Sequence, residues 1–258
     1  MIDPKFKEWA CSFSGCDGGD LKSDIWLCGI EWGFVNDQGL TDEAFELRKQ
    51  QDYAEVLPAQ IAKGAYQPGA YHYFDPKRWK FPYIRNIAKL LGVIKGLDVY
   101  KLDDIKNASE SWSIFHMNLY PIAFPNESDA LWDKYHLSEV TGLESKPIYR
   151  TWCLLQRFPW IAEQVKEHQP KLIIGTGVGY LTDFIVCCGG SGIVDDIHCE
   201  KIVGEESKSE SSSRTLYWTK VNEKTTLVVA PFMTSRFGLN SNVLIEKFGK
   251  RIRDVAKI

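Results

Sequence analysis

The sequence predicts a three-layer α/β/α sandwich with a central, mainly parallel sheet of four strands. Four short apolar segments, rich in β-branched or aromatic residues, are each bounded by turn residues, as buried strands are. Patterns typical of amphipathic helices lie between them. Strands that alternate with helices and are apolar on both faces indicate a parallel sheet covered on both sides.

The expected strands span residues 24–29, 113–118, 171–175 and 225–230, and the expected helices span residues 41–57, 81–91, 147–167 and 242–256. Thr41 is placed to cap the first of these helices. No Pro- or Gly-rich linker divides the chain, so we expect one domain over residues 1–258. The low-complexity tract at residues 204–214 predicts a solvated, mobile loop or a hairpin tip.

Composition excludes several classes of protein. Hydrophobic residues make up 44% and charged residues 25% of the 258 residues, as in ordinary globular proteins. No window approaches the run of about 18 apolar residues that a membrane span needs, and the first residues lack the apolar core of a secretory signal. We therefore expect a cytoplasmic protein with no membrane partner, and we expect a monomer. With a net charge of −3, any nucleic-acid site must be a local basic patch.

The cysteines and histidines show no metal-binding pattern. The seven cysteines are odd in number and contain no C-x-x-C pair, so we expect reduced thiols, several of them buried. The spacing of His116, His136, His168 and His198 indicates structural roles. No cofactor and no metal are expected.

The residues that follow the four strands are the place to look for chemistry, because open parallel sheets bind ligands beyond the carboxyl ends of their strands. The first two segments are followed by Gly29-Ile30-Glu31-Trp32-Gly33 and by Asn118-Leu119-Tyr120-Pro121. The last two lead into Thr176-Gly177-Val178-Gly179 and into Ala230-Pro231-Phe232.

In their order and spacing these motifs resemble the uracil-DNA glycosylase superfamily, over roughly residues 20–245. A strand of that family ends in Gly-x-Asp/Asn-Pro-Gly/Tyr, and the resemblance places Glu31 in the slot that positions the attacking water, with Trp32 replacing proline. The family's second strand often ends in an Asn that reads the flipped base, which Asn118 matches. The order from Cys153-Leu154-Leu155 through Pro170-Lys171 to Gly175 is also similar. The resemblance implies a DNA glycosylase of the same fold.

Two departures change what the resemblance implies. The family's last motif is His-Pro-Ser, and here Ala230 stands where the His would be, which argues against ordinary uracil excision. Some branches hold an iron–sulfur cluster on four cysteines, but a cysteine is missing after Asn118, so no cluster is expected. The absent His and the presence of Trp32 imply a pocket for another base. Some relatives look like enzymes for hypermodified pyrimidines of phage DNA, used in defence or base turnover.

The chemistry of Glu31 supports a glycosidase-like site independently. Cleavage of a sugar bond passes through an oxocarbenium-like state, which a carboxylate stabilises while it positions water. Desolvation beside an apolar strand would raise the pKa of this carboxyl and make it a usable base. The alternative is a solvated loop acid, or one paired with an arginine.

Asn118 offers donors and an acceptor for a base edge, and its alternative role is to cap a turn. The expected pocket also contains Gly29, Ile30 and Gly33, with Asp17 as a second polar group. Stacking on an extruded base is worth about 1–3 kcal/mol per base, and the alternative role of the candidate rings is core packing. Those rings are Trp32, Phe34, Tyr73 and Phe74.

The expected DNA contacts come from basic residues near aromatic ones and from one glycine-rich turn. Gly177 follows a strand and would approach a phosphate through backbone N–H groups. Arg78 and Lys80 are interleaved with aromatic residues, and Arg236 lies beside Ser235 where the family wedges into DNA. The alternative for each charge is a solvated face.

The sequence therefore predicts a monofunctional DNA glycosylase that flips a modified pyrimidine out of DNA and leaves an abasic site. The monofunctional assignment follows from the lack of a lysine at the strand ends able to form a Schiff base. Two alternatives stay open. One is a non-catalytic nucleic-acid binder on the same fold, and the other is a hydrolase of small nucleosides.

Overall fold

A mixed seven-stranded sheet forms the centre of the protein. The computed structural model describes residues 1–34, 36, 38–190, 196–204, 213–234 and 236–258. The strand order is β1-β3-β2-β4-β7-β6-β5. The strands are β1 (Gly18–Gly19), β2 (Ile25–Gly29), β3 (Phe115–Asn118), β4 (Leu172–Thr176), β5 (His198–Val203), β6 (Ser213–Lys220) and β7 (Thr226–Ala230). The α/β class is confirmed, but the sheet has seven strands rather than four.

The four expected strands are confirmed as the central ones. They are β3, β2, β4 and β7, and each pairs in parallel with its neighbour. Every residue of these four strands is buried. The register sets Gly29 opposite Asn118, so the carboxyl ends of β2 and β3 lie side by side.

The three additional strands lie at the edges of the sheet and pair antiparallel. β1 joins β3, and β6 joins β7 and β5. β5 is mostly exposed and polar, so it lacks the apolar run by which a buried strand is found. Val203 pairs with Ser213, which makes β5 and β6 a hairpin. The connecting residues 205–212, where a mobile loop was expected, lie outside the described residues.

Helices complete the chain between the strands. They are α1 (Pro4–Ala10), α2 (Asp42–Gln51), α3 (Leu57–Ala62), α4 (Pro82–Ile94), α5 (Leu102–Ser109), α6 (Leu131–Lys134), α7 (Leu137–Thr141), α8 (Lys146–Trp152), α9 (Phe158–His168), α10 (Leu181–Gly189) and α11 (Asn242–Ala256). Single π-helical turns join α2 to α3 (η1, Asp52–Val56) and α8 to α9 (η3, Cys153–Arg157), and short 3₁₀ turns form η2 (Pro76–Lys80) and η4 (Val178–Tyr180). The first expected helix therefore runs past residue 57, and the Thr41 cap is confirmed by its bond from the N–H of Ala44.

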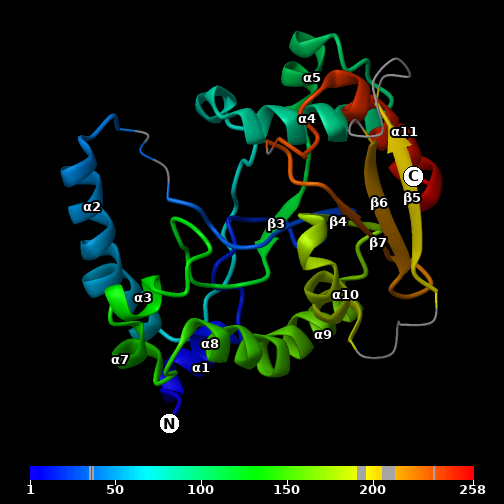
Figure 1. Cartoon of the computed structure of the whole chain (residues 1–258). Coiled ribbons are helices and arrows are strands. Elements are labelled where there is room, and N and C mark those ends of the chain that lie inside the picture. The colour runs from blue at the N-terminus through cyan, green and yellow to red at the C-terminus, as the bar shows by residue number, and fades with distance from the viewer. Residues whose placement is uncertain (35, 37, 191–195, 205–212, 235) are drawn as a thin grey trace.

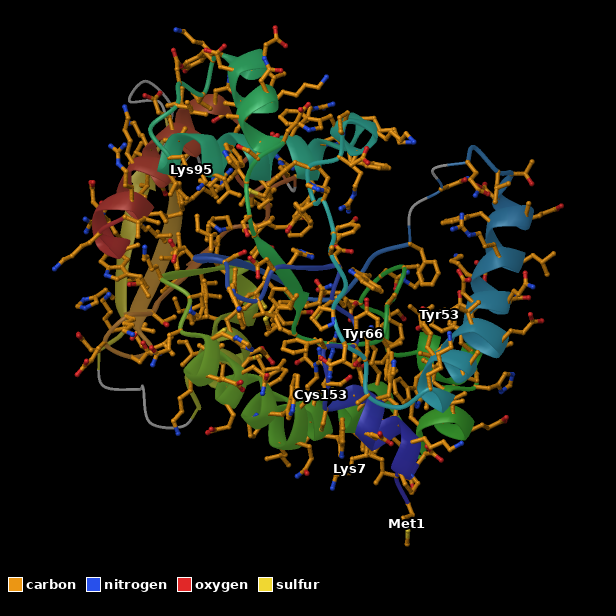
Figure 2. The ribbon with its side chains drawn as sticks, turned by 180° about the vertical axis from the view of Figure 1, so that it is seen from behind. Met1, Lys7, Tyr53, Tyr66, Lys95 and Cys153 are labelled. Atoms are coloured by element: carbon orange, nitrogen blue, oxygen red, sulfur yellow. The ribbon has the colours of Figure 1, made fainter. Side chains whose placement is uncertain are left out.

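Helices lie on both faces of the sheet (Figure 1). Ile25 and Leu27 of β2 pack with α4 and α11 on one face, whereas Trp26 and Cys28 pack with α9 and α10 on the other. This alternation follows from the period of two along a strand. The run from α2 to α3 lies to one side, and its Tyr53 (Figure 2) donates a hydrogen bond to the carbonyl of Ala123 at 2.6 Å.

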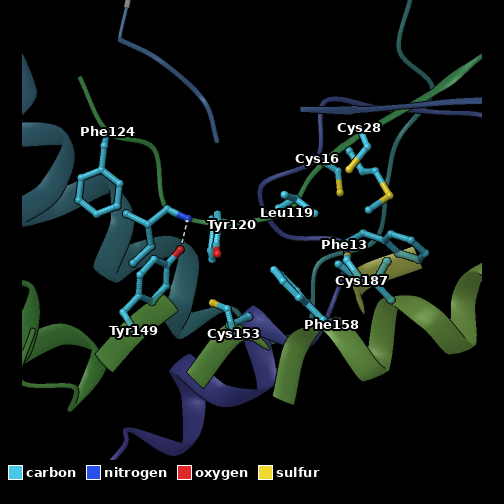
Figure 3. Close-up of a cluster of buried hydrophobic side chains, with 14 of the residues drawn as sticks. Phe13, Cys16, Cys28, Leu119, Tyr120, Phe124, Tyr149, Cys153, Phe158 and Cys187 are labelled. Atoms are coloured by element: carbon cyan, nitrogen blue, oxygen red, sulfur yellow. Dashed lines mark hydrogen bonds between the residues drawn. The ribbon is translucent and has the colours of Figure 1, made fainter. Parts of the chain in front are cut away.

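Several cysteines are buried in the core on the α9 face (Figure 3). Cys16 and Cys28 lie near Phe13 and Leu119, and burial raises the pKa of Cys16 to about 11. Cys153 is buried in the same cluster, where burial raises its pKa to about 12. All seven cysteines are free and five of them are buried, so the prediction that several thiols are buried is confirmed.

A buried arginine connects the N-terminal segment to the end of β3. Arg157 of η3 is fully buried and donates to the carbonyls of Leu119 at 2.8 Å and Asn118 at 3.2 Å. It also donates to the carbonyls of Ala10, Ser12 and Ser14. The guanidinium therefore holds residues 10–14 against the strand end that carries Asn118.

Candidate active site

Glu31 lies just beyond the carboxyl end of β2, on a segment that stays tied to the chain after β3. The N–H groups of Leu119, Tyr120 and Phe124 donate to the carbonyls of Gly29, Ile30 and Trp32 at 2.9–3.0 Å. These bonds extend the parallel pairing past the strands. They place Glu31 in the shelter of the loop that follows Asn118.

The carboxyl group of Glu31 titrates near neutral pH. Its side chain is 10% exposed, and Oε1 lies 3.8 Å from Nζ of the fully buried Lys146. Burial raises the pKa of Glu31 to about 7, although Lys146 and Arg150 pull it down. Oε2 is buried and has no hydrogen-bond partner among the described residues. The expected rise in pKa from desolvation is confirmed, and the partner of the carboxyl is a lysine.

Two cations from one helix face Glu31. Lys146 and Arg150 are four residues apart on α8, so they lie on the same face of the helix. Nζ of Lys146 lies 3.7 Å from the centre of the Phe124 ring and donates to the carbonyl of Asn126 at 3.3 Å. Nε and Nη2 of Arg150 are buried and have no hydrogen-bond partner within the described part of the chain. Burial lowers the pKa of Lys146 from its usual value.

Two tyrosine–carboxylate pairs lie near these charges. Tyr180 donates to Oε1 of Glu127, and Tyr120 donates to Oδ1 of Asp183, each at 2.7 Å. Burial and the acceptor carboxylates raise the pKa of both tyrosines. At neutral pH both hydroxyl groups therefore stay protonated and act as donors.

Asn118 is held in place rather than open to solvent. It is 2% exposed, and its Nδ2 donates to the carbonyl of Gly15 at 2.7 Å. Its Oδ1 faces the backbone of Gly29, because a Cβ at Gly29 would overlap with that oxygen. One half of the amide is thus engaged inside the protein, and its role in reading a base stays a prediction.

Asp17 belongs to a second polar cluster, on the α4 side of the sheet. Its Oδ2 lies 2.8 Å from Nδ1 of His116 and 3.9 Å from Nη2 of Arg78. Burial raises the pKa of Asp17, but His116 and Arg78 outweigh it and lower that pKa overall. The ring of Tyr73 lies 4.6 Å from that of His116, and Arg78 also donates to the hydroxyl of Tyr71.

The expected aromatic residues separate into exposed and buried ones. Trp32 is 36% exposed, and no heavy atom lies within 4 Å of the position that a Cβ would take at Gly33. Phe34 packs against Tyr53, with ring centres 5.5 Å apart. Tyr73 and Phe74 are buried, Tyr73 against His116 and Phe74 against Trp112. Trp32 is thus the most exposed of the four rings expected to stack on a base.

The expected DNA-contacting residues have different surroundings in the structure. Arg236 is exposed, with its guanidinium 5.6 Å from the Phe237 ring centre, and Lys80 lies over the ring of Phe81. Arg78 is engaged with Asp17 and Tyr71, as described above. Ser235 lies outside the described residues.

The structure contradicts the expectation that the N–H of Gly177 contacts a DNA phosphate. Its N–H donates to the carbonyl of Ala230 at 2.8 Å, so it is not available to a phosphate. Its φ of 128° favours glycine, and a Cβ there would come within 2.8 Å of Cδ1 of Ile30. The glycine therefore allows β4, β7 and the loop after β2 to approach closely. Ile30 itself packs against the core on the α9 face.

Sequence reasoning missed Lys146, Arg150 and His116 as partners of the site. Lys146 and Arg150 carried one signal, their spacing of four residues at the start of an expected helix. His116 carried another, because it is two residues before Asn118 and so shares its face of the strand. In the parts of the chain that the structure describes, no three His, Cys, Asp or Glu side chains are placed to hold a metal ion. No helix among the described residues is long and apolar enough to cross a membrane.

No protein-family model matches the chain, and no curated protein matches it significantly.

Proposed function

We propose that the protein is a DNA glycosylase that hydrolyses the N-glycosidic bond of a modified pyrimidine, with Glu31 as its general base. The fold that goes with this proposal is the three-layer sandwich of the uracil-DNA glycosylase superfamily. The parallel order β3-β2-β4-β7 and the helices on both faces are in keeping with it. One observation carries the proposal, namely a sheltered carboxyl with a pKa of about 7 at the carboxyl end of a central parallel strand.

Glu31 has the properties that a carboxyl group needs in order to catalyse the hydrolysis of a glycosidic bond. A pKa close to the working pH is the most effective for general base catalysis. The ionised form accepts a proton from water and also stabilises positive charge at C1′ of the sugar. The attacking oxygen forms the bond to C1′, the C1′–N bond breaks, and the electron pair leaves with the base.

Recognition of the base falls to the loop residues around the two strand ends. Oδ1 of Asn118 faces Gly29, and Trp32, three residues after Gly29, offers a partly exposed ring. Extrusion of a base from the stack costs a few kcal/mol. One or two good stacking contacts of about 1–3 kcal/mol each offset that cost.

The sequence-based reason for a monofunctional enzyme does not hold. That reason was the lack of a lysine at the strand ends, and Lys146 lies 3.8 Å from Glu31. α8 supplies this lysine from a distant part of the sequence. The proposal is therefore a glycosylase, without the restriction to base release alone.

The test is base release from defined DNA by purified protein. Duplex and single-stranded oligonucleotides carry uracil, 5-hydroxymethyluracil, 5-hydroxymethylcytosine or glucosylated 5-hydroxymethylcytosine, and genomic DNA of phages rich in modified pyrimidines is included. Released bases are separated by chromatography, and hot alkali converts abasic sites into strand breaks. We expect release of a modified base, and at least 100-fold slower release with E31Q, in the range that a general base contributes.

Glu163→Gln is the matched control, because Glu163 also faces a lysine, Lys166, at 3.6 Å but on the exposed surface. Its rate should equal that of the wild type. DNA binding without base release from any substrate would favour the non-catalytic binder. Release from free nucleosides alone would favour the small-molecule hydrolase.

A further inference from the structure

We propose that Lys146 is an amine nucleophile that forms a Schiff base with an abasic deoxyribose and so gives this site a second activity, abasic-site lyase. The inference uses the same Glu31 site as the proposed glycosylase and adds a reaction on its product. It rests on the surroundings of Lys146, which resemble those of an activated amine more than those of a surface cation.

Lys146 is poorly solvated as a cation. Its side chain is fully buried, and its ammonium group has three N–H donors. One of them reaches the carbonyl of Asn126 at 3.3 Å, and the ring of Phe124 excludes water from Nζ at 3.7 Å, although this cation–π contact by itself favours the charged form. Arg150 on the same face of α8 adds a second positive charge. Desolvation and a neighbouring cation are the two means by which proteins make a lysine nucleophilic.

Glu31 is placed to accept the proton that the amine must lose. Its Oε1 lies 3.8 Å from Nζ, and Oε2 has no partner among the described residues. Transfer of one proton turns a buried ion pair into a neutral amine and a carboxylic acid. Because burial penalises both charged forms, the neutral pair is more accessible here than at an exposed Lys–Glu pair.

The reaction balances without a co-reactant. The neutral Nζ adds to C1′ of the open-chain sugar aldehyde, and the carboxylic acid of Glu31 donates a proton to the hydroxyl group that leaves as water. The product is a protonated imine. The Glu31 carboxylate then takes a proton from C2′, the C3′–O bond breaks, and its electron pair leaves with the 3′ phosphate. Water hydrolyses the imine and restores Lys146.

The test uses an oligonucleotide with one preformed abasic site, so it does not depend on which base the enzyme removes. Protein and oligonucleotide are mixed with sodium borohydride, which reduces an imine to a stable amine. We expect a covalent protein–DNA adduct, mapped to Lys146 by peptide mass spectrometry. Without borohydride we expect strand breaks that need no alkali.

Two substitutions and one control show whether Lys146 is the amine that forms the adduct. K146R keeps the positive charge but cannot form the imine, and K146M removes the charge, so both should abolish the adduct. Circular dichroism melting shows whether each variant is folded. K166M is the matched control, since Lys166 lies near Glu163 on the surface, and it should form the adduct as the wild type does.

Each outcome separates this inference from the proposed glycosylase. An adduct without base release from any DNA supports Lys146 and rejects the glycosylase. Base release without an adduct supports the glycosylase and rejects the lyase. An adduct that persists in folded K146R, or that maps to another amine, also overturns the assignment.

Discussion

Gly29 and Asn118 face each other across β2 and β3, so closely that a methyl group at position 29 would overlap with Oδ1 of Asn118. The glycine is therefore a packing requirement of the site and not merely a flexible joint. The same asparagine is held from the other side by the carbonyl of Gly15. It has little room to move aside.

The substitution G29A should therefore destabilise the protein by about 1–3 kcal/mol, the usual cost of overpacking. Urea denaturation at pH 7 measures the free energy of unfolding. Gly33, a few residues along the chain, has no heavy atom near the position of its missing Cβ. G33A should change stability by less than about 0.5 kcal/mol, and equal effects of the two variants would contradict the overlap.

Glu31 should make the protein less stable as the pH rises. Its pKa is about 7 in the folded protein and has the ordinary glutamate value of 4.5 in the unfolded chain, so its contribution is most favourable below pH 4.5 and is lost as the pH rises through 7. The shift corresponds to about 3 kcal/mol at pH 8. E31Q has no such charge to bury, so we expect it to be more stable than the wild type at pH 8 and similar at pH 5.

Urea denaturation of both proteins at the two pH values checks this expectation, with E163Q as the control for an exposed Glu–Lys pair. A wild type that loses no more stability than E31Q between pH 5 and pH 8 would show that Glu31 titrates normally.

Asp17 should have the opposite pH dependence. Its pKa lies below the usual 3.8, because His116 and Arg78 outweigh the effect of burial. Its stabilising contribution is therefore present above pH 3.8 and disappears as the pH falls through the folded pKa. D17N should destabilise the protein at pH 7, and the difference from the wild type should shrink in acid.

Thermal melting of D17N across this pH range measures the effect. Asp24 offers a matched control, since its pair with Lys171 at 2.8 Å is mostly exposed. D24N should change stability little at any pH, as is usual for surface ion pairs. The same small change in D17N would contradict a stabilising role for the Asp17–His116 contact.

Arg157 should be one of the least replaceable residues of the chain. It donates to five backbone carbonyls in two segments, and all five would lose this donor in R157M, although that of Ser14 also accepts from the Cys16 thiol. Each buried polar group left without a partner costs about 1–3 kcal/mol, although such costs are not additive. We expect R157M to lose at least about 3 kcal/mol in urea denaturation, and the partly exposed Arg253 provides the control R253M. A loss below about 1 kcal/mol would show that water readily replaces the guanidinium.

Arg236 tests the expected DNA contact after β7. If it neutralises one phosphate, R236A should weaken binding about equally for all sequences and lower the salt slope by about one. Fluorescence anisotropy with a labelled oligonucleotide at several salt concentrations measures that slope. K250A, at an exposed lysine paired with Glu246 on α11, should leave it unchanged. Identical slopes for R236A and the wild type would remove Arg236 from the interface.

The central strands could be predicted because a buried parallel strand carries its own signature. The segments that became β2, β3, β4 and β7 are short, apolar and bounded by turn residues. The same argument predicted where chemistry should be sought, since Glu31 and Asn118 each stand at the end of such a strand. The edge strands β5 and β6 were missed because one face of an exposed hairpin is polar.

The partners of those residues were decided only by the tertiary structure. The sequence by itself determined that Glu31 follows a buried strand and that desolvation would raise its pKa. It did not determine that Lys146 of α8 would lie beside Glu31 or that His116 would contact Asp17. Nor did it determine that the N–H of Gly177 would donate to the carbonyl of Ala230. Local patterns report burial because burial repeats with the period of a helix or strand. A contact between distant residues has no such period, so it emerges only when the layers pack.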